Sequence, residues 1–471
     1  MAATAARAAT DLTERVPEGG GDLALRPSPT VRPATVGRVD TIAAMETHRL
    51  STLPGGERVI SERIEGVRSA ALGLWIGAGS RDETNARAGV SHFIEHLLFK
   101  GTERYDAVQI AEMFDAMGGE LNAATSRETT VVYTRVPDDH VDVALDVMTD
   151  MVFAPVFTDI DSEREVVLEE IAMVEDNPQD LVHDLAAEAV FGAHPLGRPV
   201  IGRAEVISSI SRRALLGYHG GTYTGENVVL AAAGNVDHDR IVEGLAARRN
   251  GAARPLVRTR KAAGRPPRPA LRFQVKDTEQ YHVCLAGPGL RRDDPRRYAA
   301  ALLDAILGGS ASSRLFQEIR EKRGMAYSVY TYGSQYVDAG QVGLYVGTRE
   351  ENLRECLDVI AGQLHDVGAG NIRPGELERA KENMKGRLLL SLESTSARMN
   401  RLGKATVTET EIVPIDETER RISQVTADEV AALARELFAP QKLSVAGIGP
   451  SEKRFRAAVE PFNPAIVGRA A

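Results

Sequence analysis

The sequence predicts a protein that mixes β-strands with α-helices and is built from two related halves. The chain of 471 residues is too long for one ordinary hydrophobic core, which indicates about two to four domains. Strand and helix patterns follow one another from about Leu50 onward. In addition, segments of the second half repeat segments of the first at a nearly constant offset.

The first half carries clear secondary-structure signals. Its expected strands are 58–64, 69–76, 120–124 and 129–136. Its expected helices cover the histidine motif described below, a segment that starts near Asp106, a segment near 141–151, and Ser162–Asp176. Asp106 and Gln109 form a plausible capping box, and Gly118-Gly119 ends that helix.

The internal repeat is visible at three places. Val136–Met148 matches Thr348–Ile360, Asp82–Glu83 matches Asp293–Asp294, and Ser162–Glu163 matches Gly375–Glu376. The three offsets are 212, 211 and 213 residues. A spacing this constant indicates an internal duplication.

The stretch Gly89–Thr102 has the strongest chemical signal, because it contains His92, Glu95 and His96. On a helix, side chains at positions i, i+3 and i+4 share one face. Two neutral imidazoles placed in this way can bind zinc and leave coordination positions open. A carboxylate beside the metal can take the proton from zinc-bound water. The H-x-x-E-H spacing is the mark of the inverzincins.

The alternative is that two histidines fall by chance on one half-buried helix. The apolar residues around them predict that the helix is mostly buried, and buried histidines and carboxylates need partners. A metal supplies these partners, so the sequence favours zinc. In the second half the same register places Leu303, Ile306 and Leu307 at the three positions, and we expect no metal there.

The acid-rich segment Ser162–Asp176 is expected to supply a third ligand. Most of its acids are expected to face solvent, but an apolar stripe runs along the helix. Glu163 and Glu170 stand seven residues apart on one side of it, next to this stripe. A carboxylate at that edge faces inward and is a candidate metal ligand.

The composition restricts the class of protein. Apolar residues make up 43% and charged residues 26%, as in soluble globular proteins. The net charge of −9 argues against nucleic acid as a partner and is compatible with a cavity that attracts basic ligands. The Arg- and Pro-rich stretch 251–272 is expected to be an exposed linker; the alternative, a nucleic-acid patch, lacks interleaved aromatic residues. Cys284 and Cys356 are expected to be buried free thiols, although one disulfide is arithmetically possible.

The start of the chain gives little sign of targeting. No apolar run is long enough to span a bilayer, and residues 1–48 lack the apolar region of a secretory signal. Ala2–Arg7 faintly resembles a mitochondrial transit peptide, but acids such as Asp11 and Glu14 weaken that interpretation. We expect a disordered tail on a cytoplasmic bacterial protein without a membrane partner, and the mitochondrial matrix is the less favoured location.

The second half has a landmark of its own at Gly308–Tyr330, where Arg320 and Tyr327 flank Gly324. Taken locally, this pattern is typical of an ordinary surface helix end. With the earlier stretches, however, it resembles the pitrilysin family of zinc peptidases, most closely the branch of the mitochondrial processing peptidase β-subunit and its single-chain bacterial relatives. The matching stretches are Gly77–Glu83, Gly89–Thr102, Glu163–Glu170, and Ser313–Phe316 running to Tyr327–Ser328. The resemblance covers about residues 49–450.

The resemblance implies an α+β fold of two homologous domains arranged as a clam shell. Each domain has a mixed, mostly antiparallel sheet with helices on one face. The expected organisation is a disordered tail (1–48), a catalytic zinc-binding domain (49–250), a basic linker (251–268) and a homologous domain without metal (269–471).

The resemblance also implies roles for individual residues. One Zn²⁺ per chain is held by His92, His96 and Glu170, with Glu169 as the register alternative to Glu170, and Glu95 is the general base. Glu163 orients the metal site. Arg320 and Tyr327 reach across from the second half to the bound peptide, where Tyr327 helps to stabilise the oxyanion. Asn122 and Ala123 lie on the edge strand to which the substrate adds as an extra strand.

The function expected from all of this is a zinc endopeptidase that cleaves extended or unfolded peptides inside a closed chamber, as a homodimer or another enclosed pair. The alternative is a non-catalytic subunit that uses the same fold to bind peptides or to assemble a processing complex. Because His92, Glu95, His96 and Glu170 are all intact, the sequence favours the enzyme. Whether such an enzyme processes or degrades its substrates stays open.

Overall fold

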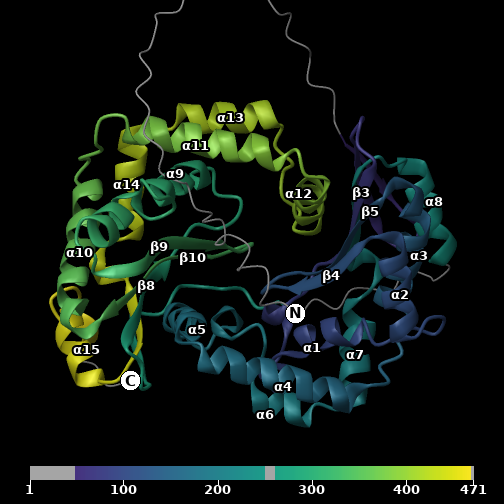
Figure 1. Ribbon diagram of the computed structural model, residues 1–471, viewed down its shortest axis with the longest axis horizontal. Coiled ribbons are helices and arrows are strands. Elements are labelled where there is room, and N and C mark those ends of the chain that lie inside the picture. Colours follow the sequence, from purple (N-terminus) through teal and green to yellow (C-terminus); the bar gives the residue numbers. More distant parts are fainter. Residues whose placement is uncertain (1–47, 250–259, 468–471) are drawn as a thin grey trace, which may run out of the picture. The chain divides into compact units, whose positions relative to one another are not determined.

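A computed structural model describes residues 48–249 and 260–467 (Figure 1). Residues 1–47 of the expected tail and residues 251–259 of the expected linker lie outside the described residues. From His48 onward the chain packs as one compact unit. The proposed limits of the two domains therefore stay predictions.

The first half forms a mixed six-stranded sheet. Its strands are β1 (Arg49–Thr52), β2 (Arg58–Arg63), β3 (Ser69–Ile76), β4 (Glu120–Thr125), β5 (Thr130–Pro137) and β6 (Val228–Gly234). They are ordered β1-β2-β6-β3-β5-β4, and only the β2–β6 pair is parallel. The four strands expected from the sequence are confirmed to within a residue or two, and β4 is an edge strand.

Helices of the first half cover one face of this sheet. They are α1 (Val90–Leu97), α2 (Ala107–Met117), α3 (Val141–Phe153), α4 (Ile160–Asp176), α6 (Ala204–Ser209), α7 (Arg212–Thr222) and α8 (His238–Arg248). The predicted capping box is confirmed at α2, where Asp106 and Gln109 cap each other and Gly118 ends the helix with a φ of 63°. The apolar sides of these helices and alternate residues of the strands form one hydrophobic core.

The second half forms a mixed five-stranded sheet. Its strands are β7 (Leu271–Val275), β8 (Gln280–Pro288), β9 (Ala326–Gln335), β10 (Gly340–Arg349) and β11 (Ser444–Gly449). The order β7-β11-β8-β10-β9 repeats the order β2-β6-β3-β5-β4, and again only the first pair is parallel. β5 ends at Pro137 and β10 at Arg349, at the predicted offset of 212. The α+β fold of two homologous units is thus confirmed.

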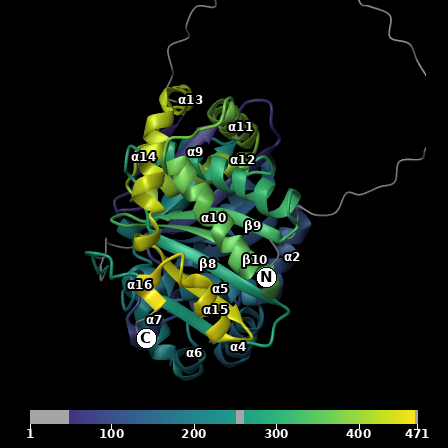
Figure 2. The ribbon, with the colours of Figure 1, turned by 90° about the vertical axis from the view of Figure 1, so that its left-hand side faces the viewer.

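Helices of the second half also cover one face of their sheet, as Figure 2 shows for α10, α14 and α15 in front of β8 and β10. Its helical segments are α9 (Arg297–Leu307), a π-helical segment (Phe316–Glu321), α10 (Leu353–Gly368), α11 (Glu376–Ser391), α13 (Ile415–Gln424), α14 (Ala427–Leu437), α15 (Glu452–Val459) and α16 (Pro464–Val467). Both cysteines are buried and free.

The other face of each sheet is covered by a helix from the opposite half. Helix α5 (Pro178–Phe191) packs on β8 and β11, and helix α12 (Thr395–Val407) packs on β3 and β6. Each helix closes a second, smaller core on the sheet face that the helices of the opposite half leave uncovered. The two halves therefore exchange equivalent helices, since α5 follows α4 just as α12 follows α11.

Two glycines allow α12 to approach its sheet closely. A Cβ atom at Gly403 would stand 2.1 Å from Nε1 of Trp75, and one at Gly73 would stand 2.5 Å from Sδ of Met399. A larger residue at Gly403 would collide with the rigid indole of Trp75 and push the helix off the strands, whereas one at Gly73 would force the flexible side chain of Met399 to move.

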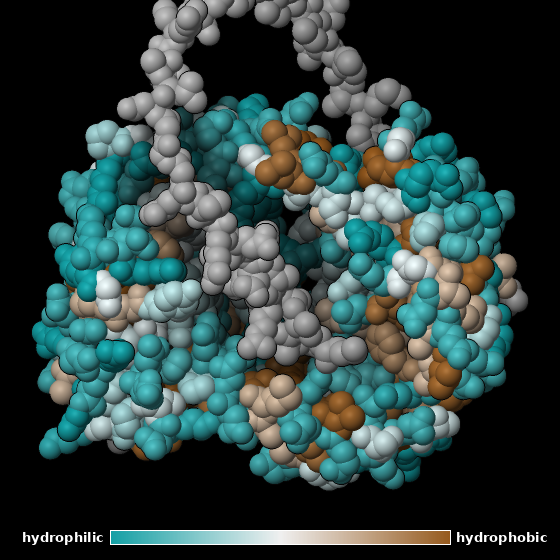
Figure 3. All heavy atoms as spheres, viewed as in Figure 1, coloured by the Kyte–Doolittle hydropathy of each residue, from teal (hydrophilic) through white to brown (hydrophobic). Residues whose placement is uncertain are grey.

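The face of the molecule in Figure 3 is mostly hydrophilic, with scattered apolar side chains. Within the described ranges, no helix has the length and apolar character needed to cross a membrane.

Candidate metal and catalytic site

Helix α1 is held at its start by a buried carboxylate. The backbone N–H groups of Gly89 and Ser91 donate to the two oxygens of Glu83, at 2.7 and 2.8 Å. Burial raises the pKa of Glu83 to about 7, although these N–H groups oppose the shift. Gly89 has a φ of 98° and packs against Gly202, with no room for a side chain. The motif helix is thereby fixed in position and rotation.

The structure brings His92, His96 and Glu170 together. The Nε2 atoms of the two histidines lie 3.3 Å apart. Oε2 of Glu170, on α4, lies 3.6 Å from Nε2 of His92 and 3.4 Å from Nε2 of His96. One ligand atom from each residue falls within 4.8 Å of the other two. Glu169, the register alternative, is exposed on the same helix, so the helix turns Glu170 inward.

A second carboxylate fixes the orientation of His96. Nδ1 of His96 lies 2.8 Å from Oε1 of Glu163, whose other oxygen pairs with Nζ of Lys100 at 2.5 Å. With its proton on Nδ1 and donated to Glu163, His96 presents a lone pair at Nε2. Glu163 thus stands where it can orient a ligand without touching the centre of the site.

Atoms that can act as acceptors converge at the centre of the site. Nδ1 of His92 is buried and has no hydrogen-bond partner among the described residues. If it carries the proton, Nε2 of His92 also presents a lone pair, and two lone pairs and a carboxylate oxygen converge. A cation at this point would satisfy all three atoms, and two imidazoles with one carboxylate form a donor set that suits Zn²⁺. The residues present therefore fit a zinc ion.

The ionisation of these groups reflects burial and mutual charge. Burial lowers the pKa of His92. Burial also acts to lower the pKa of His96, but hydrogen bonds to Glu163 and Glu170 outweigh it and raise the pKa to about 9. The hydrogen bond with His96 lowers the pKa of Glu170.

Glu95 lies on the same face of α1 and is 6% exposed. Its Oε2 has no hydrogen-bond partner within the part of the chain that the structure describes. Burial raises the pKa of Glu95, opposed by a hydrogen bond with Thr125 at the end of β4. A buried carboxylate with a free oxygen and a raised pKa is suited to accept a proton.

The remaining expected residues lie elsewhere. Arg320 stacks over the ring of Tyr327 at 4.3 Å, and Tyr327 is 71% exposed at the start of β9. Across the described ranges, neither forms a hydrogen bond or ion pair with the histidines of the cluster. Asn122 is exposed and Ala123 is buried on the edge strand β4, where Oδ1 of Asn122 accepts from the N–H of Ala123.

Three residues of the site were not assigned roles from the sequence. Lys100 follows His96 by four residues, so helical spacing could have placed it beside Glu163. Glu83 precedes the motif, and an acid before a helix is an ordinary capping signal. Thr125 carries no local signal, because only the packing of α1 against β4 brings it to Glu95.

Comparison with known families gives two adjacent matches. Residues 58–204 match the family described as Insulinase (Peptidase family M16). Residues 209–384 match the Peptidase M16 inactive domain. The first match contains the histidine cluster, and the second contains helix α9, where Leu303, Ile306 and Leu307 stand at the equivalent positions.

Relatives with similar sequences span nearly the same length. An uncharacterized zinc protease of Streptomyces coelicolor is 43% identical over 418 residues, which cover 86% of this chain and 90% of the relative. The uncharacterized zinc protease YmxG of Bacillus subtilis is 40% identical over 410 residues, which cover 85% of this chain and 98% of the relative.

Two solved structures share the fold. A protease from Helicobacter pylori superposes with a TM-score of 0.79 at 20% identity, covering 85% of this chain and 99% of that chain. A peptidase M16 inactive domain from Pseudomonas fluorescens superposes with a TM-score of 0.80 at 23% identity, covering 86% and 98%. At these identities the likeness shows the fold alone.

Proposed function

This chain belongs to peptidase family M16, the insulinase family, and from that premise we propose that it is a zinc-dependent endopeptidase acting on extended peptides. The observation that carries the proposal is the convergence of two imidazoles and a carboxylate, with Glu95 on the same face of α1 as the imidazoles and one of its oxygens without a partner among the described residues. The relatives named zinc proteases support the choice of metal.

His92, His96 and Glu170 would hold one Zn²⁺ per chain. When bound, the ion supplies a Lewis acid for the scissile carbonyl and acidifies a coordinated water. Glu163 and Lys100 keep His96 in the tautomer and orientation that this role needs.

Glu95 is the proton carrier in this proposal. It accepts a proton from the attacking water and delivers it to the leaving amine. The raised pKa of Glu95 lies closer to neutral pH, which makes both the uptake and the release of the proton easier.

The substrate is proposed to add as a strand to the edge of β4, along Asn122 and Ala123. The second half would close over it, so that the cleaved bond is enclosed. Arg320 would then contact the peptide, and the phenol of Tyr327 would donate to the developing oxyanion. The exposure of Tyr327 supports this role, because an exposed hydroxyl is free to meet a ligand.

A peptide-binding or assembly subunit without catalytic activity is the second candidate. The match of residues 209–384 to an inactive domain favours it for that part of the chain. The intact cluster in the first half favours the enzyme.

The deciding experiment is cleavage of a peptide library, read by mass spectrometry, with the zinc-loaded protein and with Glu95→Gln. We expect cleavage by the wild type and a loss of about a hundred- to ten-thousandfold in Glu95→Gln, because an amide cannot accept the proton. Zinc content and peptide binding should be retained. Binding without cleavage by the wild type would favour the non-catalytic subunit, and a Glu95→Gln rate within tenfold of wild type would require another base.

Assembly and location complete the proposal. We propose a homodimer, and analytical ultracentrifugation that shows a fully active monomer would contradict it. Adjacent exposed leucines at the end of α11, Leu389 and Leu390, offer apolar area for such a contact. We place the protein in the bacterial cytoplasm, which cell fractionation can test.

A further inference from the structure

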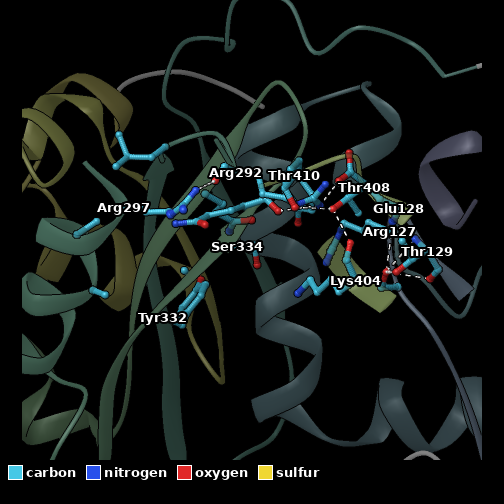
Figure 4. Close-up of a pocket in the computed structure, with 18 of the residues that line it drawn as sticks. Arg127, Glu128, Thr129, Arg292, Arg297, Tyr332, Ser334, Lys404, Thr408 and Thr410 are labelled. Atoms are coloured by element: carbon cyan, nitrogen blue, oxygen red, sulfur yellow. Dashed lines mark hydrogen bonds and ion pairs between the residues drawn. The ribbon is translucent and has the colours of Figure 1, made fainter. Parts of the chain in front are cut away.

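A cavity of about 890 Å³ lies next to the proposed substrate strand. Its walls come from the end of β4 and the turn that follows it, from β9, from the start of α9, and from α12 and the segment after it. In Figure 4, Arg297 and Tyr332 lie on one side and Glu128 and Thr129 on the other, with Lys404 between the two groups.

Positive charge dominates this wall. The basic lining residues are Arg127, Arg292, Arg297, Arg401 and Lys404, and the acidic ones are Glu128, Asp304 and Glu411. Two of the acids are already engaged: Glu128 accepts from Arg81 and Arg292, and Glu411 pairs with Arg421 at 3.5 Å. Burial raises the pKa of Asp304, the third acid, which favours its neutral form.

Three of the basic groups have no acidic partner among the described residues. Arg297 donates to the backbone oxygen of Arg292 and to the hydroxyl of Tyr298, at 3.4 and 3.1 Å. Arg401 donates only to a backbone oxygen, that of Val413. The side-chain ammonium of Lys404 forms no hydrogen bond or ion pair in the described ranges, although the backbone oxygen of this residue accepts from Thr408.

Lys404 is the most exposed of the three to the contents of the cavity. Lys404 is exposed, whereas Arg297 and Arg401 are each half-buried. Burial lowers the pKa of Lys404, and the nearby charge of Arg292 lowers it further, while Glu128 opposes the shift. An anion in the cavity would relieve this repulsion.

The cavity adjoins the proposed catalytic site at one strand residue. Thr125 lines it, and the same residue forms a hydrogen bond with Glu95. Ala124, the preceding residue of β4, also lines it. A peptide paired along β4 therefore passes from the neighbourhood of Glu95 into the basic cavity.

We propose that this cavity is a specificity subsite that binds a carboxylate of the substrate, namely an aspartate or glutamate side chain near the cleaved bond, with Lys404, Arg297 and Arg401 as its basic wall. The proposal rests on the proposed peptidase function and names its substrate class. It also limits what the net charge indicates: the chain carries −9 overall, but this cavity is locally basic. The carboxylate could instead be the C-terminus of the peptide, and the test separates the two sources.

The test uses one cleavable sequence in four forms, with Glu or Gln near the cleaved bond and a free or amidated C-terminus. Wild type should cleave the Glu forms with a kcat/KM about tenfold above the Gln forms, as expected for an ion pair that is only partly shielded from water. Amidation of the C-terminus should change kcat/KM little. Dependence on the free C-terminus instead would assign the cavity to the terminal carboxylate and overturn the side-chain proposal.

Three variants assign the preference to the cavity. Lys404→Met should bring the ratio of kcat/KM for the Glu and Gln forms close to one. Lys404→Glu should make the Glu form the poorer substrate and should favour a further form of the peptide with Lys at the same position. Lys453→Met, on the distant surface of α15, should keep the tenfold ratio. Equal rates for the Glu and Gln forms in wild type, or a preference that survives both Lys404 changes, would overturn the proposal.

A binding measurement separates this proposal from the peptidase function. Fluorescence anisotropy of the labelled Glu and Gln peptides with Glu95→Gln should show about tenfold tighter binding of the Glu form, which Lys404→Met abolishes in the double variant. If no peptide is cleaved by wild type but this difference is present, the peptidase proposal fails and the subsite stands. If cleavage occurs but neither assay distinguishes the peptides, only the subsite fails.

Discussion

The two halves of this protein share one framework but fill the same place in it with different chemistry. Where α1 carries His92, Glu95 and His96, α9 carries Leu303, Ile306 and Leu307, all 2% exposed or less. The strands beneath both helices follow the same order. The framework therefore does not depend on the side chains of His92, Glu95 and His96, which the first half adds to a fold that aliphatic packing can stabilise alone.

The acids at the start of the next shared helix make the comparison sharper. Glu163 on α4 and Glu376 on α11 occupy matching positions and are both buried. Glu163 binds His96 and Lys100, whereas Glu376 binds the guanidinium of Arg314 at 2.6 and 2.8 Å. Each half thus uses the same carboxylate to hold a nitrogen side chain, but only in the first half does that side chain face a possible ligand.

The largest contrast should come from truncating matched positions of α1 and α9. His92→Ala should lose zinc and all measurable cleavage, because it removes one of three ligands. Leu303→Ala should keep zinc but lose about 2–5 kcal/mol of unfolding free energy to the cavity it leaves. Metal analysis and denaturant unfolding measure the two effects. Full zinc in His92→Ala would remove this residue from the metal site.

The second contrast concerns the matched acids. Glu376→Gln should destabilise the fold by about 3–5 kcal/mol, since it leaves the fully buried Arg314 without its main partner. Glu163→Gln should instead weaken zinc affinity by about 10- to 100-fold. Chemical denaturation and a chelator competition assay on both variants test this division. Similar zinc losses in both would show that the halves are not independent.

A third change tests whether the second half contributes to catalysis at all. Tyr327→Phe should lower kcat by about a hundred- to a thousandfold, or roughly 3–4 kcal/mol, if its hydroxyl donates to the oxyanion. Zinc content should not change. Arg320→Ala should act mainly on KM. Normal steady-state kinetics in both variants would leave the second half with a structural role only.

The smallest contrast lies between two equivalent hairpin turns. Glu128, after β4, is buried and accepts from Arg81, Arg292 and the N–H of Val337, whereas the side chain of Asp338, after β9, is 36% exposed. Glu128→Gln should cost about 3 kcal/mol of unfolding free energy, and Asp338→Asn less than about 1 kcal/mol. Thermal unfolding of the two variants would show whether this pair of turns is as unequal as its burial suggests.

Much of the framework could be predicted because its signals are local or repeated. Apolar alternation marked the strands of the first half, and the constant offset predicted the matching order of the second sheet. Helical spacing placed His92, Glu95 and His96 on one face. The family resemblance left Glu169 as the register alternative to Glu170, because only the packing of α4 against α1 decides which of the two faces inward.

What could not be predicted depends on contacts between distant segments. An amphipathic helix shows that it has an apolar side but not which sheet it covers, so the exchange of α5 and α12 carried no sequence signal. The bond of Thr125 to Glu95 and the basic wall around Lys404 arise in the same way. The net charge gave no sign of this basic wall, because a sum over the chain does not describe one cavity.

The exchanged helices also affect how the protein is made. During synthesis the first half leaves the ribosome with one face of its sheet uncovered, and α12 emerges only after residues 235–394 have followed. Until then Ile60, Trp75 and Val229 form an apolar surface on unpartnered strands, a state prone to aggregation and suited to chaperone binding. Once both helices are in place, neither half can unfold without exposing the sheet of the other, so we expect one cooperative melting transition. The first half expressed on its own should be insoluble.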